Sequence, residues 1–498
     1  MSRDSGLSRR CFLGAGAASL LPAAARAAAP VGEALRPFLD RASKASSRSD
    51  MLRMLRSADT SGFSREDAAI LRMIVRGLER EEALRRAFPF GRPDGGSPYV
   101  VSQRHGAWLE ADGKADRATL PRRLDAETER LRDAAAHGIV PPLFMLDAVI
   151  AGERARLSSP AGPALARQVA MLDSLRAKAP REPGVWQLPG GADYYALRLR
   201  CTTGSGLSPV ALGRLIDAEI KILNARADSL LKRFGLSRGS VGARLRALKQ
   251  RPETLYSNDE AGRARAVADM NAALARLRPH LPAWFNPPFE PGSRVAPMSA
   301  ADEKAGKRGY RVPPAATTPG VYYPDLGNVH DRPSWTLTSV AYHETIPGHM
   351  IQLRRQEIAN PHPLQVRHAA GYSEGWAIYA ESLADRIGLL NPVEQIGFVQ
   401  SWLFRLARVA ADLGIHLHRW NRARALLFLE EAIGFELFFP FAVEADRYAA
   451  EPAGFAGDAF AALSLRRMRP AAAAPARVFH DRALDHGPLT VEALREIV

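Results

Sequence analysis

The sequence is poor in cysteine and has no long apolar run. Cys11 and Cys201 are the only cysteines among its 498 residues. Because Cys11 lies in an N-terminal segment that resembles a targeting signal, Cys201 is left alone and an intramolecular disulfide is excluded. Nowhere does an apolar stretch reach the roughly 20 residues that a membrane span needs. Stability must therefore come from a hydrophobic core or a metal, and we expect no stable membrane anchor.

A basic block is also missing, although the formal net charge is +15. The arginines are scattered through helical segments, mixed with acidic residues, and not interleaved with aromatic side chains. Nucleic-acid-binding proteins typically gather their positive charge on one patch. We favour a solvated surface and expect no nucleic-acid partner. The sequence does not reveal the oligomeric state.

The N-terminus carries an export pattern. Arg9 and Arg10 precede a mildly apolar run, Phe12–Leu21, and Ala25–Ala27 offers a small-residue cleavage site. Residues 1–27 therefore resemble a twin-arginine signal, with an ordinary secretory signal as the alternative. Both interpretations predict a periplasmic or secreted mature protein.

Residues 28–280 have the pattern of an N-terminal helical lobe. The clearest helix begins at Ser208, which can cap it, continues with Pro209 in the first turn, and ends before Gly235. The strand–helix alternation that builds a parallel sheet is missing. We expect a mainly α protein.

Prolines crowd the start of the second half, 281–498, which we interpret as the catalytic lobe. They exclude long helices there, while 293–296 and 320–323 are candidate strands of a small antiparallel element. Helical periodicity resumes near Ser334. An Ala/Pro run at 470–476 predicts a linker-like spacer.

His343, His349 and Glu374 are residue types that bind zinc. A hydrolytic zinc needs three protein ligands and an open position for water. The familiar spacing puts two histidines four residues apart on one helix. Here the spacing is six, which on an ideal helix leaves the imidazoles about 120° apart. Pro347 and Gly348 favour a widened turn that brings both rings to one ion. The alternative is a helix end with a surface His349.

Longer segments around these residues resemble a known family. Residues 341–352 look like the signature of the domain-of-unknown-function 885 family, whose members are similar to gluzincin metallopeptidases such as thimet oligopeptidase and angiotensin-converting enzyme. Residues 188–195 and 371–381 match further family stretches, so the resemblance covers nearly the whole mature chain. Other matching positions are Thr202, Thr203, Arg405, Arg408, Asp412, Gly414, His416, Trp420, Arg447, Tyr448, Phe479, His480, Asp481, Gly487, Pro488 and Leu489.

This resemblance implies a two-lobed, elongated, gluzincin-like helical fold and a peptidase that uses Zn²⁺. Carried over to this chain, it makes His343, His349 and Glu374 the zinc ligands. Glu344 becomes the general base, which takes a proton from water and passes it to the leaving amine. The expected substrate is a peptide, held in extended form along an edge strand beside the metal helix.

Such a mechanism also needs a donor for the developing oxyanion. His480, Tyr448 and Tyr372 are the candidates, and Tyr372 is also a candidate for substrate binding. His480 is equally plausible as a structural histidine next to Asp481, which caps a turn. Arg447 either binds a substrate carboxylate or pairs with Glu444 or Asp446.

Two further positions leave alternatives open. Glu381, two turns beyond Glu374, either orients a metal ligand or lies on a solvated helix face. Within 452–460 the chain departs from the family pattern, since a glutamine is absent and Phe460 stands where a tyrosine is expected. Loss of a donor costs roughly 2.7–4 kcal/mol of transition-state stabilisation. A zinc-bearing envelope binding or scaffold protein without turnover is therefore one alternative function.

The other alternative is a serine hydrolase. Residues 371–375 fit G-x-S-x-G, the nucleophile elbow of α/β-hydrolases, with Ser373 as nucleophile. That elbow must follow a buried strand, and residues 365–370 lack the apolar character of one.

Overall fold

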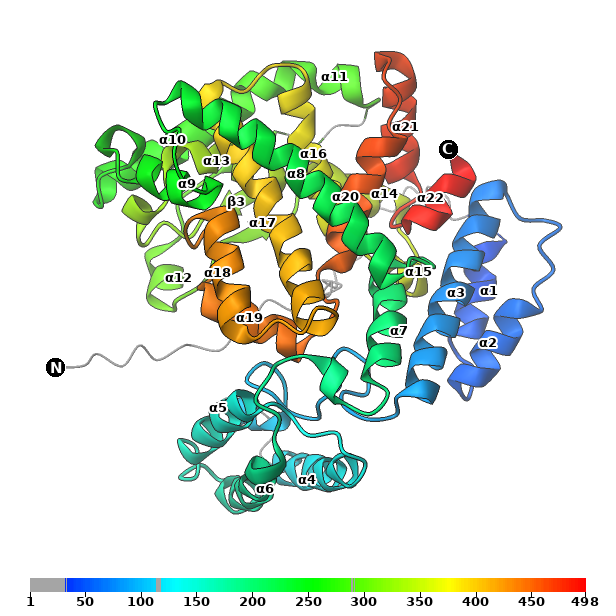
Figure 1. The fold of residues 1–498 in the computed structure, drawn as a ribbon. Coiled ribbons are helices and arrows are strands. Elements are labelled where there is room, and N and C mark those ends of the chain that lie inside the picture. Colours follow the sequence, from blue (N-terminus) through cyan, green and yellow to red (C-terminus); the bar gives the residue numbers. More distant parts are fainter. Residues whose placement is uncertain (1–31, 33, 113–117, 288–289, 291) are drawn as a thin grey trace.

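The structure is a computed structural model that describes residues 32, 34–112, 118–287, 290 and 292–498. The expected signal at 1–27 lies outside these residues. Helices make up most of the described chain, together with one small sheet, so the prediction of a mainly α protein is confirmed (Figure 1).

The first half of the chain forms long helices and one small separate cluster. Ser208 caps the helix predicted after it by accepting a hydrogen bond from the backbone of Ala211, and Gly235 follows its end with a positive φ. Figure 1 shows α4, α5 and α6 grouped at the lower edge of the molecule. The helices of this half are α1 (Leu35–Ala42), α2 (Arg48–Arg56), α3 (Arg65–Ala87), α4 (Leu120–Ala136), α5 (Leu143–Arg154), α6 (Gly162–Leu175), α7 (Gly191–Thr203), α8 (Pro209–Arg233), α9 (Val241–Lys249), α10 (Glu260–Leu277) and α11 (Leu281–Trp284).

The second half is helical from Ser334 onward, as predicted. The spacer predicted at 470–476 is wrong in its second part, because α21 already begins at Ala473; alanine is the best helix former and outweighs the single Pro475 in the first turn. The helices of this half are α12 (Ala300–Lys304), α13 (Ser334–Glu344), α14 (His349–Ala359), α15 (Pro363–His368), α16 (Tyr372–Arg386), α17 (Pro392–His416), α18 (Arg422–Ile433), α19 (Phe441–Ala450), α20 (Ala456–Met468), α21 (Ala473–Asp485) and α22 (Val491–Ile497).

A three-stranded sheet lies in the proline-rich segment. Its strands are β1 (Arg294–Val295), β2 (Tyr310–Val312) and β3 (Val321–Tyr323), in the order β1-β3-β2. The expected antiparallel pairing holds for β2 and β3 but is wrong for β1, which runs parallel to β3. The chain passes through α12 and β2 between these two strands, so it returns to β1 in the same direction. Sequence patterns missed β2, which forms an edge of the sheet.

Helix α17 is at the centre of the core. Asn391 and Glu394 start it with a reciprocal capping box, and its side chains are buried on nearly every face, as expected of an interior helix. Helix α8 packs along α17, α10 against α13, and α3 against α22. Helices from both sides of residue 280 therefore share one core, and the expected division at 280 does not separate two cores. Within the described part of the chain, no helix combines the length and apolar character needed to cross a bilayer.

Candidate metal centre

A break between α13 and α14 shapes the centre. Helix α13 ends at Glu344 and α14 starts at His349, and Ile346-Pro347 between them is a cis peptide. The Gly348 amide donates to the carbonyl of Tyr342 at 3.1 Å, six residues back instead of four. A side chain at Gly348 would meet the carbonyl oxygen of His343 at 2.1 Å, so only glycine fits. The widened turn predicted at this position is a full interruption of the helix.

The interruption brings both histidines to one carboxylate. The rings of His343 and His349 lie 4.9 Å apart, nearly perpendicular to each other. Each Nε2 is 3.4 Å from one oxygen of Glu374, which comes from the first turn of α16. One ligand atom from each of the three residues lies within 4.8 Å of the other two. The indole of Trp376 donates to the carbonyl of Pro347 at 3.1 Å and thereby ties α16 to the break.

These residues fit a zinc ion. Two imidazoles and one carboxylate, with a further position open, are the ligand set of a catalytic zinc. His349 Nε2 is buried and lies 3.4 Å from Glu374 without a well-formed hydrogen bond, and a metal would bind between the two. The side chain of Glu374 is 39% exposed, so one face of the centre remains accessible to water or a substrate.

Glu381 contacts His343 through the ring nitrogen that does not face Glu374. Its Oε1 lies 3.0 Å from His343 Nδ1, and its side chain is only 1% exposed. This bond fixes the tautomer that leaves His343 Nε2 free for a metal. Of the two roles considered for Glu381, the structure shows the ligand contact and excludes a solvated helix face.

The three candidate ligands are electrostatically coupled. Burial and Arg405 lower the pKa of His343, but hydrogen bonds with Glu374 and Glu381 outweigh them and raise that pKa to about 9. Burial and Arg311 lower the pKa of His349. Although burial opposes its charge, Glu374 has a pKa well below the ordinary value, because both imidazoles lie next to it. An ionised carboxylate therefore lies beside a protonated His343 and a neutral His349, and a metal would have to replace the proton on His343.

Two arginines that the sequence did not single out for the site also reach the centre. Arg311, on the edge strand β2, forms an ion pair with Glu344. Burial alone would raise the pKa of Glu344, but the charges of Arg311, His343 and His349 together outweigh it and lower that pKa. Arg405 of α17 lies 3.9 Å from Glu374 and over the ring of Phe438.

The proposed oxyanion donors lie elsewhere or are already bonded. Both ring nitrogens of His480 have protein partners, Tyr379 at 2.6 Å and the carbonyl of Trp284 at 2.9 Å. The hydroxyl of Tyr448 donates to buried Glu444 at 3.0 Å. These contacts give His480 and Tyr448 structural roles in the core.

The proposed substrate-binding residues have other contacts. Tyr372 lines a small apolar cavity shared with Leu489 and Leu494 of the C-terminal segment. Arg447 lies 4.2 Å from the centre of the Phe455 ring and pairs with Glu451 at 3.4 Å, a partner that was not expected, and with Glu444 at 3.8 Å, one of the two that were.

The altered stretch 452–460 affects the centre differently from expectation. Phe460 packs in a small apolar cluster with Leu207 and Val491, so a hydroxyl at this position would not point to the metal ligands. Asp458 does reach the centre electrostatically: burial and the charge of Glu374 raise its pKa to about 7.

Ser373 does not sit in a nucleophile elbow. It follows helix α15 and lies in the first turn of α16, and no strand precedes it. Its hydroxyl lies 3.4 Å from His349 Nδ1 and donates to Gln352 at 3.1 Å. The nucleophile elbow of the serine-hydrolase alternative is therefore absent at Ser373, whose hydroxyl is a neighbour of His349.

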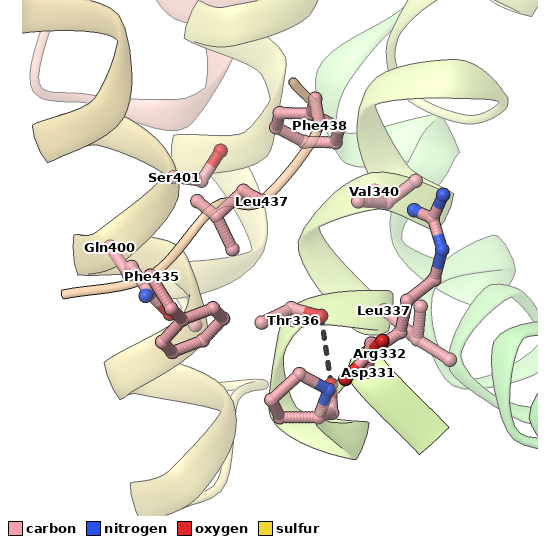
Figure 2. Close-up of a pocket in the computed structure, with 12 residues that line it drawn as sticks. Asp331, Arg332, Thr336, Leu337, Val340, Gln400, Ser401, Phe435, Leu437 and Phe438 are labelled. Atoms are coloured by element: carbon pink, nitrogen blue, oxygen red, sulfur yellow. Dashed lines mark hydrogen bonds between the residues drawn. The ribbon is translucent and has the colours of Figure 1, made fainter. Parts of the chain in front are cut away.

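A pocket lies between α13, α17 and the segment 434–440. It encloses about 430 Å³, counting space open to solvent. Figure 2 shows Val340, Leu437 and Phe438 around its upper part and Phe435 and Thr336 lower down. Thr336 donates within the protein, to the carbonyl of Pro333, so it leaves the walls mainly apolar. Val340 precedes Glu344 by one turn of α13, so this helix contributes both to the pocket and to the candidate centre.

Comparison with known proteins gives the family and the fold. A family model described as "Bacterial protein of unknown function (DUF885)" matches residues 151–498. The chain belongs to the DUF885 family. A comparison with curated proteins finds no match.

Two solved structures are similar to this DUF885 protein. The "putative lipoprotein" from Colwellia psychrerythraea is 22% identical, with a TM-score of 0.72, over 90% of this chain and 89% of that chain. A "putative lipoprotein of unknown function" from Shewanella oneidensis is 13% identical, with a TM-score of 0.67, over 90% of each chain. At these identities the likeness shows a shared fold.

Several family-matching residues of the DUF885 chain build the core and not the site. The hydroxyl of Tyr195 donates to Asp412 at 2.5 Å, and the Ala453 amide donates to the same carboxylate at 3.1 Å. Burial raises the pKa of Asp412 to about 7. His416 accepts from the Val185 amide at 3.1 Å. These residues join α7, α17 and the loop before α20.

Proposed function

We propose that this protein is an exported zinc-dependent peptidase with a gluzincin-like fold. One observation carries the proposal: the break after α13 brings His343, His349 and Glu374 together, with Glu344 beside them on the same helix. Metal-assisted hydrolysis requires a ligand set such as two imidazoles and one carboxylate. It also requires a second carboxylate that does not bind the metal and can act on water.

The chain's own residues would divide the chemistry as follows. Zinc, when bound, polarises a carbonyl and lowers the pKa of water. Glu344 accepts the proton of the attacking water and passes it to the leaving nitrogen. Glu381 keeps His343 in the ligating tautomer, and Ser373 bonds the outer nitrogen of His349.

A peptide is the substrate that the surroundings favour. Strand β2 is an edge strand, and the ion pair of its Arg311 with Glu344 brings that strand next to the metal helix. An extended peptide can pair its main chain with such an edge. The pocket at Val340 and Phe438 would accept one apolar side chain of that peptide.

We infer an envelope location. The twin-arginine pattern at 1–27 supports export. Both similar solved structures are described as lipoproteins by their titles, which is consistent with an exported family.

Metal content and turnover test the proposal together. We expect about one zinc per purified mature chain by elemental mass spectrometry, lost in His343→Ala and in Glu374→Ala. His418→Ala, which removes an exposed histidine of the loop after α17, is the matched control and should keep its zinc. A metal-free wild-type protein would overturn the assignment.

A zinc-bearing binding protein without turnover is the second candidate. The ion pair of Arg311 with Glu344 favours this second candidate, because a Glu344 carboxylate that is paired with an arginine is less available to accept a proton from water. Glu344→Gln separates the two candidates. Loss of peptide cleavage with zinc retained supports the peptidase, whereas a wild-type protein that binds zinc and peptides but cleaves none supports the binding protein.

A further inference from the structure

Arg311 reaches the candidate metal centre through its ion pair with Glu344, the proposed general base. Its charge also lowers the pKa of Glu344 and of His349, which agrees with a guanidinium close to both. Its side chain is 24% exposed and therefore reaches solvent.

The Arg311 guanidinium has N–H donors that its ion pair with Glu344 does not use. An arginine carries five N–H donors in a rigid fork. Nη1 contacts Glu344, and no hydrogen bond of its other donors to a described residue is formed. The backbone of Arg311 is fixed by pairing with Tyr322 of β3, so the position of the fork is set by the sheet. Donors held in place before the reaction stabilise a developing charge more effectively than mobile ones.

The three residues proposed from the sequence as oxyanion donors have other contacts. His480 uses both ring nitrogens in the core, Tyr448 bonds Glu444, and Tyr372 lines the small apolar cavity shared with the C-terminal segment. Hydrolysis at the centre still requires a group that carries the negative charge on the carbonyl oxygen.

We propose that Arg311 is this group: its free N–H donors stabilise the carbonyl oxygen of the substrate as that oxygen becomes an oxyanion. The inference rests on the proposed peptidase function. Water oxygen bonds to the carbonyl carbon while Glu344 takes one water proton, and the π pair of the carbonyl moves onto its oxygen, where Arg311 meets it. The pair then returns, the C–N bond breaks, and Glu344 gives its proton to the leaving nitrogen.

The test compares Arg311→Gln and Arg311→Lys with wild type. Arg294→Gln, which removes an exposed arginine from β1 of the same sheet, is the control. Each variant is checked for zinc content and for its circular dichroism spectrum. Peptides ending in a free carboxylate and the same peptides with an amidated C-terminus are the substrates. A phosphinic peptide, whose phosphinate oxygens imitate the oxyanion, serves as a ligand in calorimetry.

We expect Arg311→Gln to lower kcat by roughly 10²–10³-fold on both substrate types, with little change in KM, because the interaction forms only in the transition state. Affinity for the phosphinic peptide should fall by a similar factor, while affinity for the cleaved product peptide stays constant. Arg311→Lys keeps the charge but not the planar fork of donors. Its kcat and its affinity for the phosphinic peptide should therefore lie between those of wild type and Arg311→Gln. Arg294→Gln should match wild type in every assay.

Three outcomes would overturn the inference. A rise in KM confined to substrates with a free carboxylate would make Arg311 a carboxylate anchor. Faster turnover in Arg311→Gln would make its ion pair a lock on Glu344. Equal affinity of wild type and Arg311→Gln for the phosphinic peptide would exclude contact with the oxyanion. If wild type cleaves no peptide, the proposed function fails separately, and the phosphinic-peptide affinities still decide the role of Arg311.

Discussion

Replacing Glu381 by glutamine tests whether its bond to His343 tunes the metal centre. Glu381 Oε1 lies 3.0 Å from His343 Nδ1 inside the core. Glutamine keeps the shape and one acceptor but loses the negative charge, so the bond that orients the imidazole weakens. Removal of such a partner typically lowers metal affinity 10–100-fold, which corresponds to about 1.4–2.7 kcal/mol.

Zinc affinity would be measured by competition with a chelator. Because zinc binds the folded state, the gain in unfolding free energy at a fixed excess of zinc should shrink by the same 1.4–2.7 kcal/mol. Taking the difference between zinc-loaded and zinc-free protein cancels any effect of the substitution on the fold itself. Glu357→Gln, on the outer face of α14, is the control. An affinity within about twofold of wild type would refute the reasoning, since the Glu381 charge would then not influence the ligand.

Three predictions concern stability and are checked by urea unfolding. Arg408→Met should lower the free energy of unfolding by about 3–5 kcal/mol, because the buried Glu444 carboxylate loses its ion pair at 2.7 Å. A double variant that also replaces Glu444 by leucine should recover most of this loss, because no buried charge is then left unpaired. Gly375→Ala should lower the free energy of unfolding by about 1–3 kcal/mol, since its Cβ would lie 2.4 Å from a side chain of α20. Gly213→Ala is the control: its Cβ would have its nearest neighbour at 3.9 Å, so the variant should be more stable than wild type by up to about 1 kcal/mol. Burial raises the pKa of Glu153 from 4.5 to about 8, and neither of its oxygens has a hydrogen-bond partner. Between these pH values the unfolded chain has released a proton that Glu153 still holds in the folded chain, so wild-type stability should fall as pH rises from about 4.5 to about 8. Glu153→Gln should have a shallower slope and be more stable than wild type by a few kcal/mol at pH 8, and the remaining slope should come from groups such as Asp412 and Asp458, whose pKa values are also raised.

Local signals in the sequence were sufficient for the helices. Ser208 and Pro209 marked the start of α8 because capping and ring geometry act within one turn. Strand β2 was missed for the opposite reason. Three residues, Tyr310–Val312, carry too little pattern to identify a strand, and they become one by pairing with β3.

The metal ligands could be proposed from the sequence because two of them come from one short segment. Pro347 and Gly348 signalled that the helix would not continue, and the structure shows the break. Glu374 was proposed as a third ligand because it lies 25 residues beyond His349 at the start of a following helix, and the family resemblance implied the same residue. The spacing could not show where its side chain points, which the turn after α15 decides.

The other residues at the centre escaped prediction for a topological reason. Arg311 precedes Glu344 by 33 positions, and only the antiparallel return of β2 onto β3 brings its side chain to the base. No periodicity marks such a contact, because a charged residue on an edge strand looks like an ordinary solvated arginine. Tyr448 and His480 looked functional for the converse reason: a polar side chain that bonds within the core has the same one-letter signature as one that faces a substrate. The distinction depends on the partner atoms, which tertiary structure supplies. In this chain those atoms assign Tyr448 and His480 to the core and place Arg311 against Glu344, beside the candidate metal ligands.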